Sequence, residues 1–162
     1  MRVILCLLLF VSAGVAAQNI DSTKIPVVIR HTYDSIYPSL KNPAWQFNTD
    51  SLYIASVYME GLSKKVYFSK EGRLKRVVSD LPVSRTPQYI KDSLDHRYNK
   101  NYQLLSITAD VKYASIAYRD KDTHELKGMR DYKLLDYTIK ITSGGKIYNL
   151  NYNYNSHELM EE

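Results

Sequence analysis

The chain has 162 residues, and its 22 basic and 17 acidic side chains give a formal net charge of +5 at pH 7. This surplus is mild and does not by itself indicate a nucleic-acid-binding protein. The single cysteine, Cys6, lies close to the N-terminus. The rest of the chain therefore excludes disulfides, a thiol nucleophile and cysteine-ligated zinc. Tyrosine is frequent, with 15 copies, and it favours strands because its ring packs on a pleated surface.

Residues 1–17 have the pattern of a secretory signal peptide. Arg2 supplies the positive charge, an unbroken apolar run follows from Val3 to Val11, and Val15 and Ala17 fit the −3 and −1 positions of a signal-peptidase site. The apolar run is shorter than the roughly 20 residues that span a bilayer. We therefore predict cleavage after Ala17 and a periplasmic or secreted mature chain. An uncleaved N-terminal anchor helix is the alternative.

Two segments have the spacing of apolar residues that is typical of amphipathic helices. The first begins near Pro26 and places four residues on one face, namely Ile25, Ile29, Tyr33 and Ile36. The second has Thr86 as a predicted N-cap and Pro87 as its first residue, followed by Ile90, Leu94 and Tyr98. The two segments are similar to each other at a constant offset of 61 residues, which indicates an internal repeat.

The remaining sequence alternates apolar and polar residues, as expected for antiparallel strands with one buried face. Turns are predicted at Gly61, at Gly72 and at Gly144-Gly145. We therefore expect an α+β fold, a tandem repeat of one helix followed by an antiparallel meander sheet. The expected divisions are the signal peptide 1–17, a first repeat 18–81, a second repeat 82–155 with a charged, solvated insertion 119–131, and a frayed acidic tail 156–162.

The motifs of the first half resemble a known family. They are the pattern Pro-x-x-Ile-x-x-x-Tyr-x-x-x-Tyr-Pro from Pro26 to Pro38, the strand at Trp45, the Tyr-x-Ala-x-Val strand at Tyr53, and Val66-x-Phe-x-x-x-Gly72. This pattern is similar to the PepSY-like and β-lactamase-inhibitor-protein-like (BLIP-like) exported proteins of Gram-negative envelopes. The match is good over 25–81 and looser after the second helix.

The resemblance implies a tandem fold of one helix and four strands, export, and a sheet face that holds a protein partner. The related inhibitor proteins grip an enzyme with a concave, aromatic-rich sheet face, and the related PepSY domains are associated with restraint of peptidases. The family has no catalytic residues to carry over to this chain.

No pattern in the sequence indicates an enzyme, a cofactor or a metal. The chain has no Gly-x-Ser-x-Gly elbow and no glycine-rich phosphate loop. Its histidines are far apart in sequence: His31, His96, His124 and His157. The acidic residues near His124 lack the spacing of a calcium loop. We predict a non-enzymatic protein without catalytic, cofactor-binding or metal-binding residues.

The function we expect is that of an exported binding module that inhibits or regulates another envelope protein through an open sheet face. The predicted contact residues are Ile54, Tyr58 and Tyr67, which the alternation places opposite the helix-facing residues, together with Lys65 and Lys75. The alternative explanation of these aromatic residues is that tyrosine merely fills strand positions, or that this face closes against the other half.

A run of basic residues offers a second function. Only Glu71 opposes it, and it comprises Lys64, Lys65, Lys70, Arg73, Lys75 and Arg76. Such a patch could hold an acidic partner or the phosphates of an anionic lipid surface, as in a structural, surface-associated envelope protein. A solvated strand face, with lysines that guard an edge, is the simpler explanation and the one we favour. Nucleic acid is not an expected partner.

Overall fold

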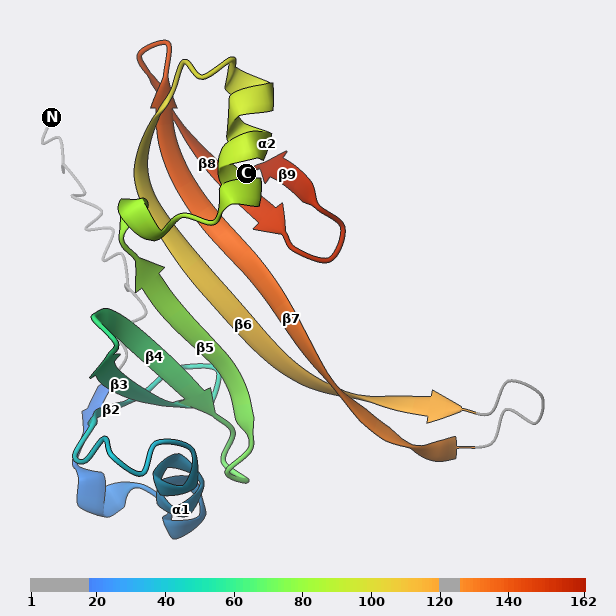
Figure 1. Cartoon of the computed structure of the whole chain (residues 1–162). Coiled ribbons are helices and arrows are strands. Elements are labelled where there is room, and N and C mark those ends of the chain that lie inside the picture. The colour runs from blue at the N-terminus through green and yellow to red at the C-terminus, as the bar shows by residue number, and fades with distance from the viewer. Residues whose placement is uncertain (1–17, 120–125) are drawn as a thin grey trace, which may run out of the picture.

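The structure is a computed structural model that describes residues 18–119 and 126–162, with side chains described outside 115–130. The predicted signal peptide, 1–17, lies outside these residues. Nine antiparallel strands form one sheet in which every strand lies beside its neighbours in sequence (Figure 1). They are β1 (Gln18–Ile20), β2 (Ala44–Phe47), β3 (Tyr53–Met59), β4 (Leu62–Phe68), β5 (Leu74–Leu81), β6 (Gln103–Arg119), β7 (Leu126–Ser143), β8 (Lys146–Asn153) and β9 (Glu158–Glu161).

Two helices, α1 (Val27–Ile36) and α2 (Gln88–Tyr98), begin where the sequence pattern places them. Each directly follows a proline, and a short 3₁₀ turn precedes each of them, η1 (Ser22–Lys24) and η2 (Val83–Arg85). Thr86 is not the N-cap, because its Oγ1 donates back to Val83 O at 2.7 Å. Neither helix of the described chain has the length and apolar content that crossing a membrane requires.

The predicted tandem repeat is wrong, because one continuous sheet runs through the point where the two repeats should meet. β5 pairs with β6 from Arg76 opposite Lys112 to Leu81 opposite Ile107. The strand that ends the first predicted repeat therefore has no free edge there. Pairing satisfies backbone N–H and C=O groups that two separate sheets would leave exposed along two edges.

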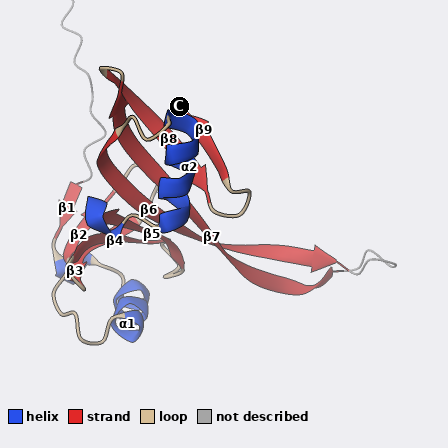
Figure 2. Ribbon diagram, turned by 45° about the horizontal axis from the view of Figure 1, so that its top comes forward, coloured by secondary structure: helices blue, strands red, loops and turns tan. Residues whose placement is uncertain are grey.

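Both helices pack on the same face of this sheet, over two separate hydrophobic cores (Figure 2). Ile29 and Tyr33 of α1 pack against Trp45, Val66 and Phe68. The core under α2 is built from Ile90, Leu94, Ile107, Tyr137, Ile139, Ile141, Leu150 and Tyr152. The cross-strand register places these sheet residues on one side of the pleat, so the opposite side carries no helix of the described chain.

The C-terminal segment is more ordered than its composition predicts. Residues Glu158–Glu161 form β9, which pairs with β8 from Leu150 opposite Glu161 to Asn153 opposite Glu158. Arg97 of α2 holds this strand from the other side, since its Nη1 donates to Leu159 O at 2.8 Å. The predicted frayed tail is therefore wrong for these residues, because the open edge of β8 offers backbone partners that a solvated tail would lack.

The β6–β7 hairpin extends far beyond the rest of the sheet. β6 has no β5 partner after Lys112, and β7 has no β8 partner before Leu135, whose carbonyl accepts from Tyr154 N at 3.1 Å. The two strands continue as a ribbon of residues 113–119 and 126–134, which projects from the body in Figure 1. We call this ribbon the arm. Of the predicted insertion 119–131, residue 119 and residues 126–131 belong to the strands of the arm, and residues 120–125 lie outside the described residues.

Candidate functional site

The side of the sheet opposite the helices, the helix-free face, is the candidate binding surface. Along one row of it, Ile54 of β3 lies opposite Tyr67 of β4, Tyr67 opposite Arg76 of β5, and Arg76 opposite Lys112 of β6. The neighbouring rows continue through β7, β8 and β9 with mainly polar residues. The face therefore crosses the join between β5 and β6 without interruption.

Tyr58 and Tyr67 lie on the helix-free face, as the alternation predicted. Tyr58 is 71% exposed, and Tyr67 is half-buried below the guanidinium of Arg76, whose Cζ lies 5.4 Å from the ring centroid. The expectation that Ile54 is also exposed is wrong, since it is only 4% exposed. Ile54 sits between Gln46 on β2 and Tyr67 on β4, whose longer side chains stand beside it.

The two predicted lysine contacts do not share one surface. Lys65 is exposed and lies on the helix-free face, opposite Ser56 and Val78. Lys75 lies at an irregularity of β5, where Phe68 pairs with Leu74 but Tyr67 pairs with Arg76. The extra residue displaces Lys75 from the regular alternation. It lines a different hollow, next to the base of the arm.

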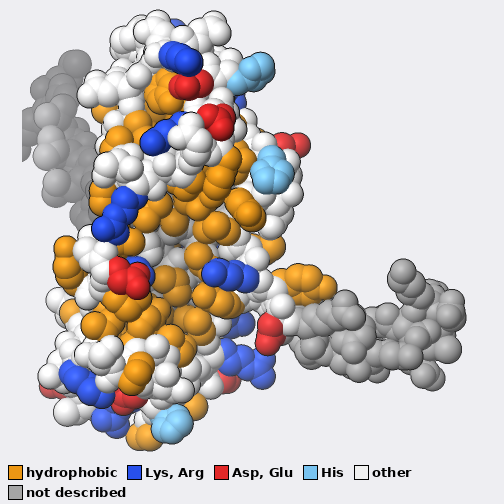
Figure 3. Space-filling model, in the orientation of Figure 1, with side chains coloured by type: hydrophobic (Ala, Val, Ile, Leu, Met, Phe, Trp, Pro, Cys, Tyr) orange, Lys and Arg blue, Asp and Glu red, His pale blue; other side chains and the backbone are white. Residues whose placement is uncertain are grey.

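The rest of the basic run is dispersed as well. Lys64 lies on the helix-bearing side with its side chain only 13% exposed, and its Nζ lies 3.4 Å from Glu60 Oε2. Lys70 is near Glu71, and Arg76 is paired with Asp110. Figure 3, which shows the helix-bearing side, has hydrophobic side chains gathered between the helices and charged ones scattered around them. The run does not form a single cationic patch.

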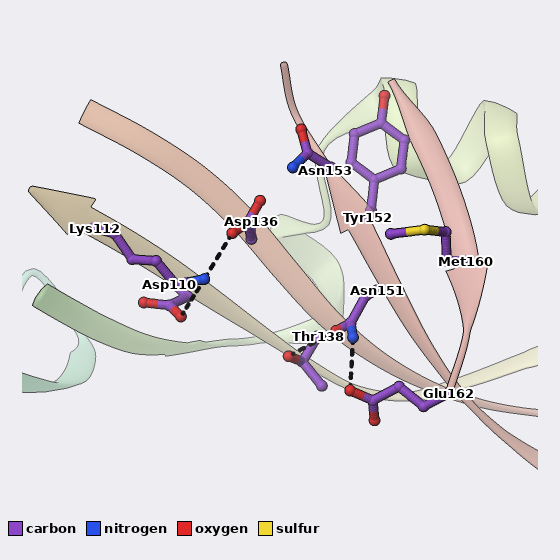
Figure 4. Close-up of a pocket in the computed structure, with 9 residues that line it drawn as sticks. All are labelled: Asp110, Lys112, Asp136, Thr138, Asn151, Tyr152, Asn153, Met160 and Glu162. Atoms are coloured by element: carbon purple, nitrogen blue, oxygen red, sulfur yellow. Dashed lines mark hydrogen bonds and ion pairs between the residues drawn. The ribbon is translucent and has the colours of Figure 1, made fainter. Parts of the chain in front are cut away.

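A polar hollow of about 320 Å³ opens on the helix-free face over β6, β7, β8 and β9 (Figure 4). Its lining carries three carboxylates and one ammonium group. The lining residues are Asp110, Lys112, Asp136, Thr138, Asn151, Tyr152, Asn153, Met160 and Glu162. The alternation of each strand directs these polar positions away from the helices, which is why the hollow is polar while the opposite side is the core.

A chain of ion pairs crosses one wall of the hollow. Arg76 Nε donates to Asp110 Oδ1 at 2.7 Å, and Lys112 Nζ donates to Asp136 Oδ2 at 2.9 Å. Lys112 Nζ also lies 3.8 Å from Asp110 Oδ2 and so joins the two pairs. The hydrogen bond to Asp110 raises the pKa of the Arg76 guanidinium above its ordinary value. These contacts fix the side chains of three neighbouring strands.

The other wall combines amides with the end of the chain. Asn151 Nδ2 donates to Glu162 Oε1 at 2.6 Å, and Thr138 Oγ1 donates to Asn151 Oδ1 at 3.3 Å. Asp136 Oδ1 is buried and has no hydrogen-bond partner. An unpartnered carboxylate oxygen among amides is an acceptor for the N–H groups of a cationic or amide side chain.

The hollow lacks several side chains that are common in nucleophilic enzymes. Its lining includes no histidine, cysteine or serine, so the Ser–His and Cys–His pairs of nucleophilic enzymes are missing among those residues. In the part of the chain that the structure describes, no group of three histidine, cysteine, aspartate or glutamate residues could hold a metal ion. The arrangement is suited to holding a polar side chain by charge and hydrogen bonds.

Sequence analysis did not identify the hollow, although one signal pointed to it. The polar members of the β7 and β8 alternation, from Asp136 to Thr142 and from Asn149 to Asn153, are visible in the sequence. The sequence does not show the strand register, which sets Asp136 opposite Asp110 and Asn153. It also does not show that β9 pairs with β8 and so brings Glu162 to Asn151.

Comparison with known proteins identifies solved structures of the same fold. No family model matches the sequence, and no curated protein matches it. A DUF2874 family protein from Bacteroides ovatus is 19% identical, with 84% of this chain and 86% of that chain covered and a TM-score of 0.59. A BLIP-like protein from Bacteroides fragilis is 14% identical, with 83% of each chain covered and a TM-score of 0.57.

A third structure is named among “putative periplasmic proteins” from Bacteroides eggerthii. It is 11% identical, with 84% of this chain and 88% of that chain covered and a TM-score of 0.56. At these identities the likeness concerns the fold alone. The BLIP-like part of the resemblance noted in the sequence is thus supported, while none of these structures is described as PepSY-like. The chain has the fold of the DUF2874 and BLIP-like proteins of Bacteroides.

Proposed function

We propose that this chain is an exported, non-enzymatic binding protein that holds another envelope protein against its helix-free face. The observation that carries the proposal is the face itself, which runs without interruption across β3–β8 and is covered by neither helix. It presents the exposed ring of Tyr58 at one end and the polar hollow at the other. An aromatic anchor beside polar groups is a usual composition of a protein-binding surface.

Export rests on the signal-peptide pattern of residues 1–17 and on the fold shared with proteins described as periplasmic. The proposal of a non-enzymatic role rests on the composition of the hollow, whose lining has no histidine, cysteine or serine. The charge of the hollow adds a feature to the partner. With three carboxylates against Lys112, it favours a partner that inserts a lysine or arginine side chain toward Asp136.

The test is affinity capture from an envelope extract with protein purified after expression of the full-length chain, followed by mass spectrometry. The Tyr58→Ala variant should lose the captured protein without a change in melting temperature, because the ring is exposed. Val27→Ala is the matched control, since Val27 is also 71% exposed but lies on α1. Equal capture by wild type and Tyr58→Ala would contradict the proposed face.

A second variant tests the hollow separately. Asp136→Asn keeps the shape of the side chain but removes its charge, and Lys112 then loses one of its two carboxylate neighbours. Binding of the captured protein should weaken, and the loss should be larger at low ionic strength, where a charge contact is least screened. An unchanged affinity for Asp136→Asn, together with a loss for Tyr58→Ala, would confine the contact to the tyrosine end of the face.

A further inference from the structure

The arm has two outer edges, and they differ in the residues that they carry. Beyond the body, the outer edge of β6 is residues 113–119 and the outer edge of β7 is residues 126–134. A two-stranded ribbon is only marginally stable in water by itself. An unprotected edge of such a ribbon is a site for another strand.

The β7 edge carries the charges that natural proteins use to block pairing. Four charged residues occur among nine positions: Lys127, Arg130, Asp131 and Lys133. The β6 edge is different. Its residues 113–118 read Tyr-Ala-Ser-Ile-Ala-Tyr, with no charge, no proline and no glycine. Six-residue segments of this composition have a strong tendency to pair with other strands.

Alternate residues of β6 direct their backbone N–H and C=O groups to its outer edge, where another strand could pair with them. The hydrogen bond between Tyr154 and Leu135 identifies these residues. Because Leu135 O accepts from Tyr154 N, the N–H and C=O of Leu135 point away from β6. These directions alternate along a strand and match between directly opposed residues. The backbone N–H and C=O groups of Lys133 and Asp131 therefore also point away from β6. Tyr113 and Ser115 lie opposite these two residues, so their backbone groups point away from β7, to the outer edge of β6.

We propose that the β6 edge of the arm pairs with the same edge of a second copy of this chain, in antiparallel register around a two-fold axis at Ile116. Ile116 is the middle of residues 113–119, so the whole free strand is matched. Ser115 of one copy then lies opposite residue 117 of the other, and both point backbone groups at the partner. The arms of the two copies form one four-stranded sheet.

Charge favours this edge and this occupant. Self-pairing through β7 around its middle residue, Arg130, would set Lys127 opposite Lys133 and Arg130 opposite itself, and like charges in these positions are destabilising. Pairing through β6 sets its one charged residue, Arg119, opposite Tyr113. Within residues 113–119, self-pairing through β6 therefore sets no two like charges opposite each other.

Cysteine crosslinking of the full-length chain, with Cys6 replaced by serine, tests the register. In the dimer the two Ile116 Cα atoms form a pair about 4.5 Å apart, within the range that a disulfide bridges. Ile116→Cys should give a disulfide-linked dimer on mild oxidation. Arg130→Cys is the matched control, because residue 130 lies opposite Ile116 in the hairpin. In the dimer, however, residue 130 of one copy lies three strand spacings, about 14 Å, from residue 130 of the other copy. Crosslinking of Arg130→Cys, or of neither variant, would overturn the proposal.

Sedimentation of the purified protein supplies a second measurement that does not depend on cysteine. Ser115→Pro removes an N–H from the β6 edge and should weaken dimerisation about tenfold or more. Lys133→Pro makes the same change at the β7 edge and should leave the dimer intact. A wild-type protein that stays monomeric at submillimolar concentration would overturn the proposal.

Discussion

Arg76 Nε donates a hydrogen bond of 2.7 Å to Asp110 Oδ1 across the join between β5 and β6. Asp110 is only 8% exposed, and Lys112 Nζ lies 3.8 Å from its other carboxylate oxygen, Oδ2. The pair fastens the strands that follow α1 to the strands that follow α2, at the row where the shared sheet leaves the body for the arm.

Replacing Arg76 with alanine should lower the free energy of unfolding by about 1.5–3 kcal/mol, because a hydrogen bond to a mostly buried carboxylate is lost. The measurement is denaturant unfolding of Arg76→Ala, Asp110→Ala and the double variant. The double variant should lose less unfolding free energy than the sum of the losses in the two single variants, since the two residues interact. Strictly additive costs would show that the pair contributes nothing.

Two tyrosines should respond in opposite directions to loss of the hydroxyl. Tyr98 Oη is buried without a hydrogen-bond partner, so Tyr98→Phe should be neutral or stabilise by about 1 kcal/mol. Tyr89 Oη donates to Tyr137 Oη at 2.8 Å, so Tyr89→Phe should destabilise by about 1 kcal/mol. Thermal unfolding of both variants checks this, and a lower melting temperature for Tyr98→Phe would contradict it.

Stability should fall at alkaline pH through the buried tyrosines. Burial, together with the hydrogen bond donated to Asp95, raises the pKa of Tyr102 from 10.0 to about 12. The unfolded chain therefore releases this proton at lower pH than the folded protein does, and the contribution, complete below pH 10, is lost as the pH rises through about 12. Burial raises the pKa of Tyr89 and Tyr33 as well.

The check is the denaturant midpoint as a function of pH for wild type and Tyr102→Phe. The variant should show a shallower loss of stability above pH 10, since phenylalanine has no proton to release. Val27→Ala is a suitable comparison, because that side chain is exposed and has no proton to release, so the shape of the wild-type curve should be unchanged. Identical curves for Tyr102→Phe and wild type would contradict the assignment.

Two glycines with positive φ should differ in their tolerance of alanine. Gly72 has φ +79°, and a Cβ there would lie 2.8 Å from Val28 Cγ2 on α1. Gly144 has φ +55° with no atom within 4 Å of such a Cβ. Gly144→Ala should cost about 1–2 kcal/mol from the left-handed backbone alone, and Gly72→Ala clearly more, because α1 must also shift. Equal unfolding free energies would show that α1 yields without cost.

Much of the local structure could be predicted from the sequence. The spacing of Ile29 and Tyr33, and of Ile90 and Leu94, identified both helices and most of their buried faces. Ile36, which the same spacing placed on the face of Ile29 and Tyr33, is 40% exposed. The glycine pair 144–145 marked the hairpin between β7 and β8. These features depend on residues within a few positions of one another, so the periodicity of the sequence is enough to predict them.

Part of the candidate site could be predicted as well. Tyr58 and Tyr67 lie on the face that the alternation assigned to them, because successive strand residues point to opposite sides. Ile54 shares that face but is buried, and alternation cannot show this, since exposure depends on the side chains of two neighbouring strands. The basic run failed for a similar reason, as one extra residue in β5 displaced Lys75 from the others.

The sequence by itself determined the elements of this protein: two short helices, each after a proline, and strands with one apolar and one polar side. Tertiary structure decided how they combine. Only strand pairing shows that β5 and β6 join two apparent repeats into one sheet. It also shows that β6 and β7 are longer than the strands beside them and so form the arm. The same pairing brings Asp110, Asp136 and Glu162 together in one hollow. The physical reason is that register and edge pairing are set by backbone contacts between distant segments, which no local pattern records.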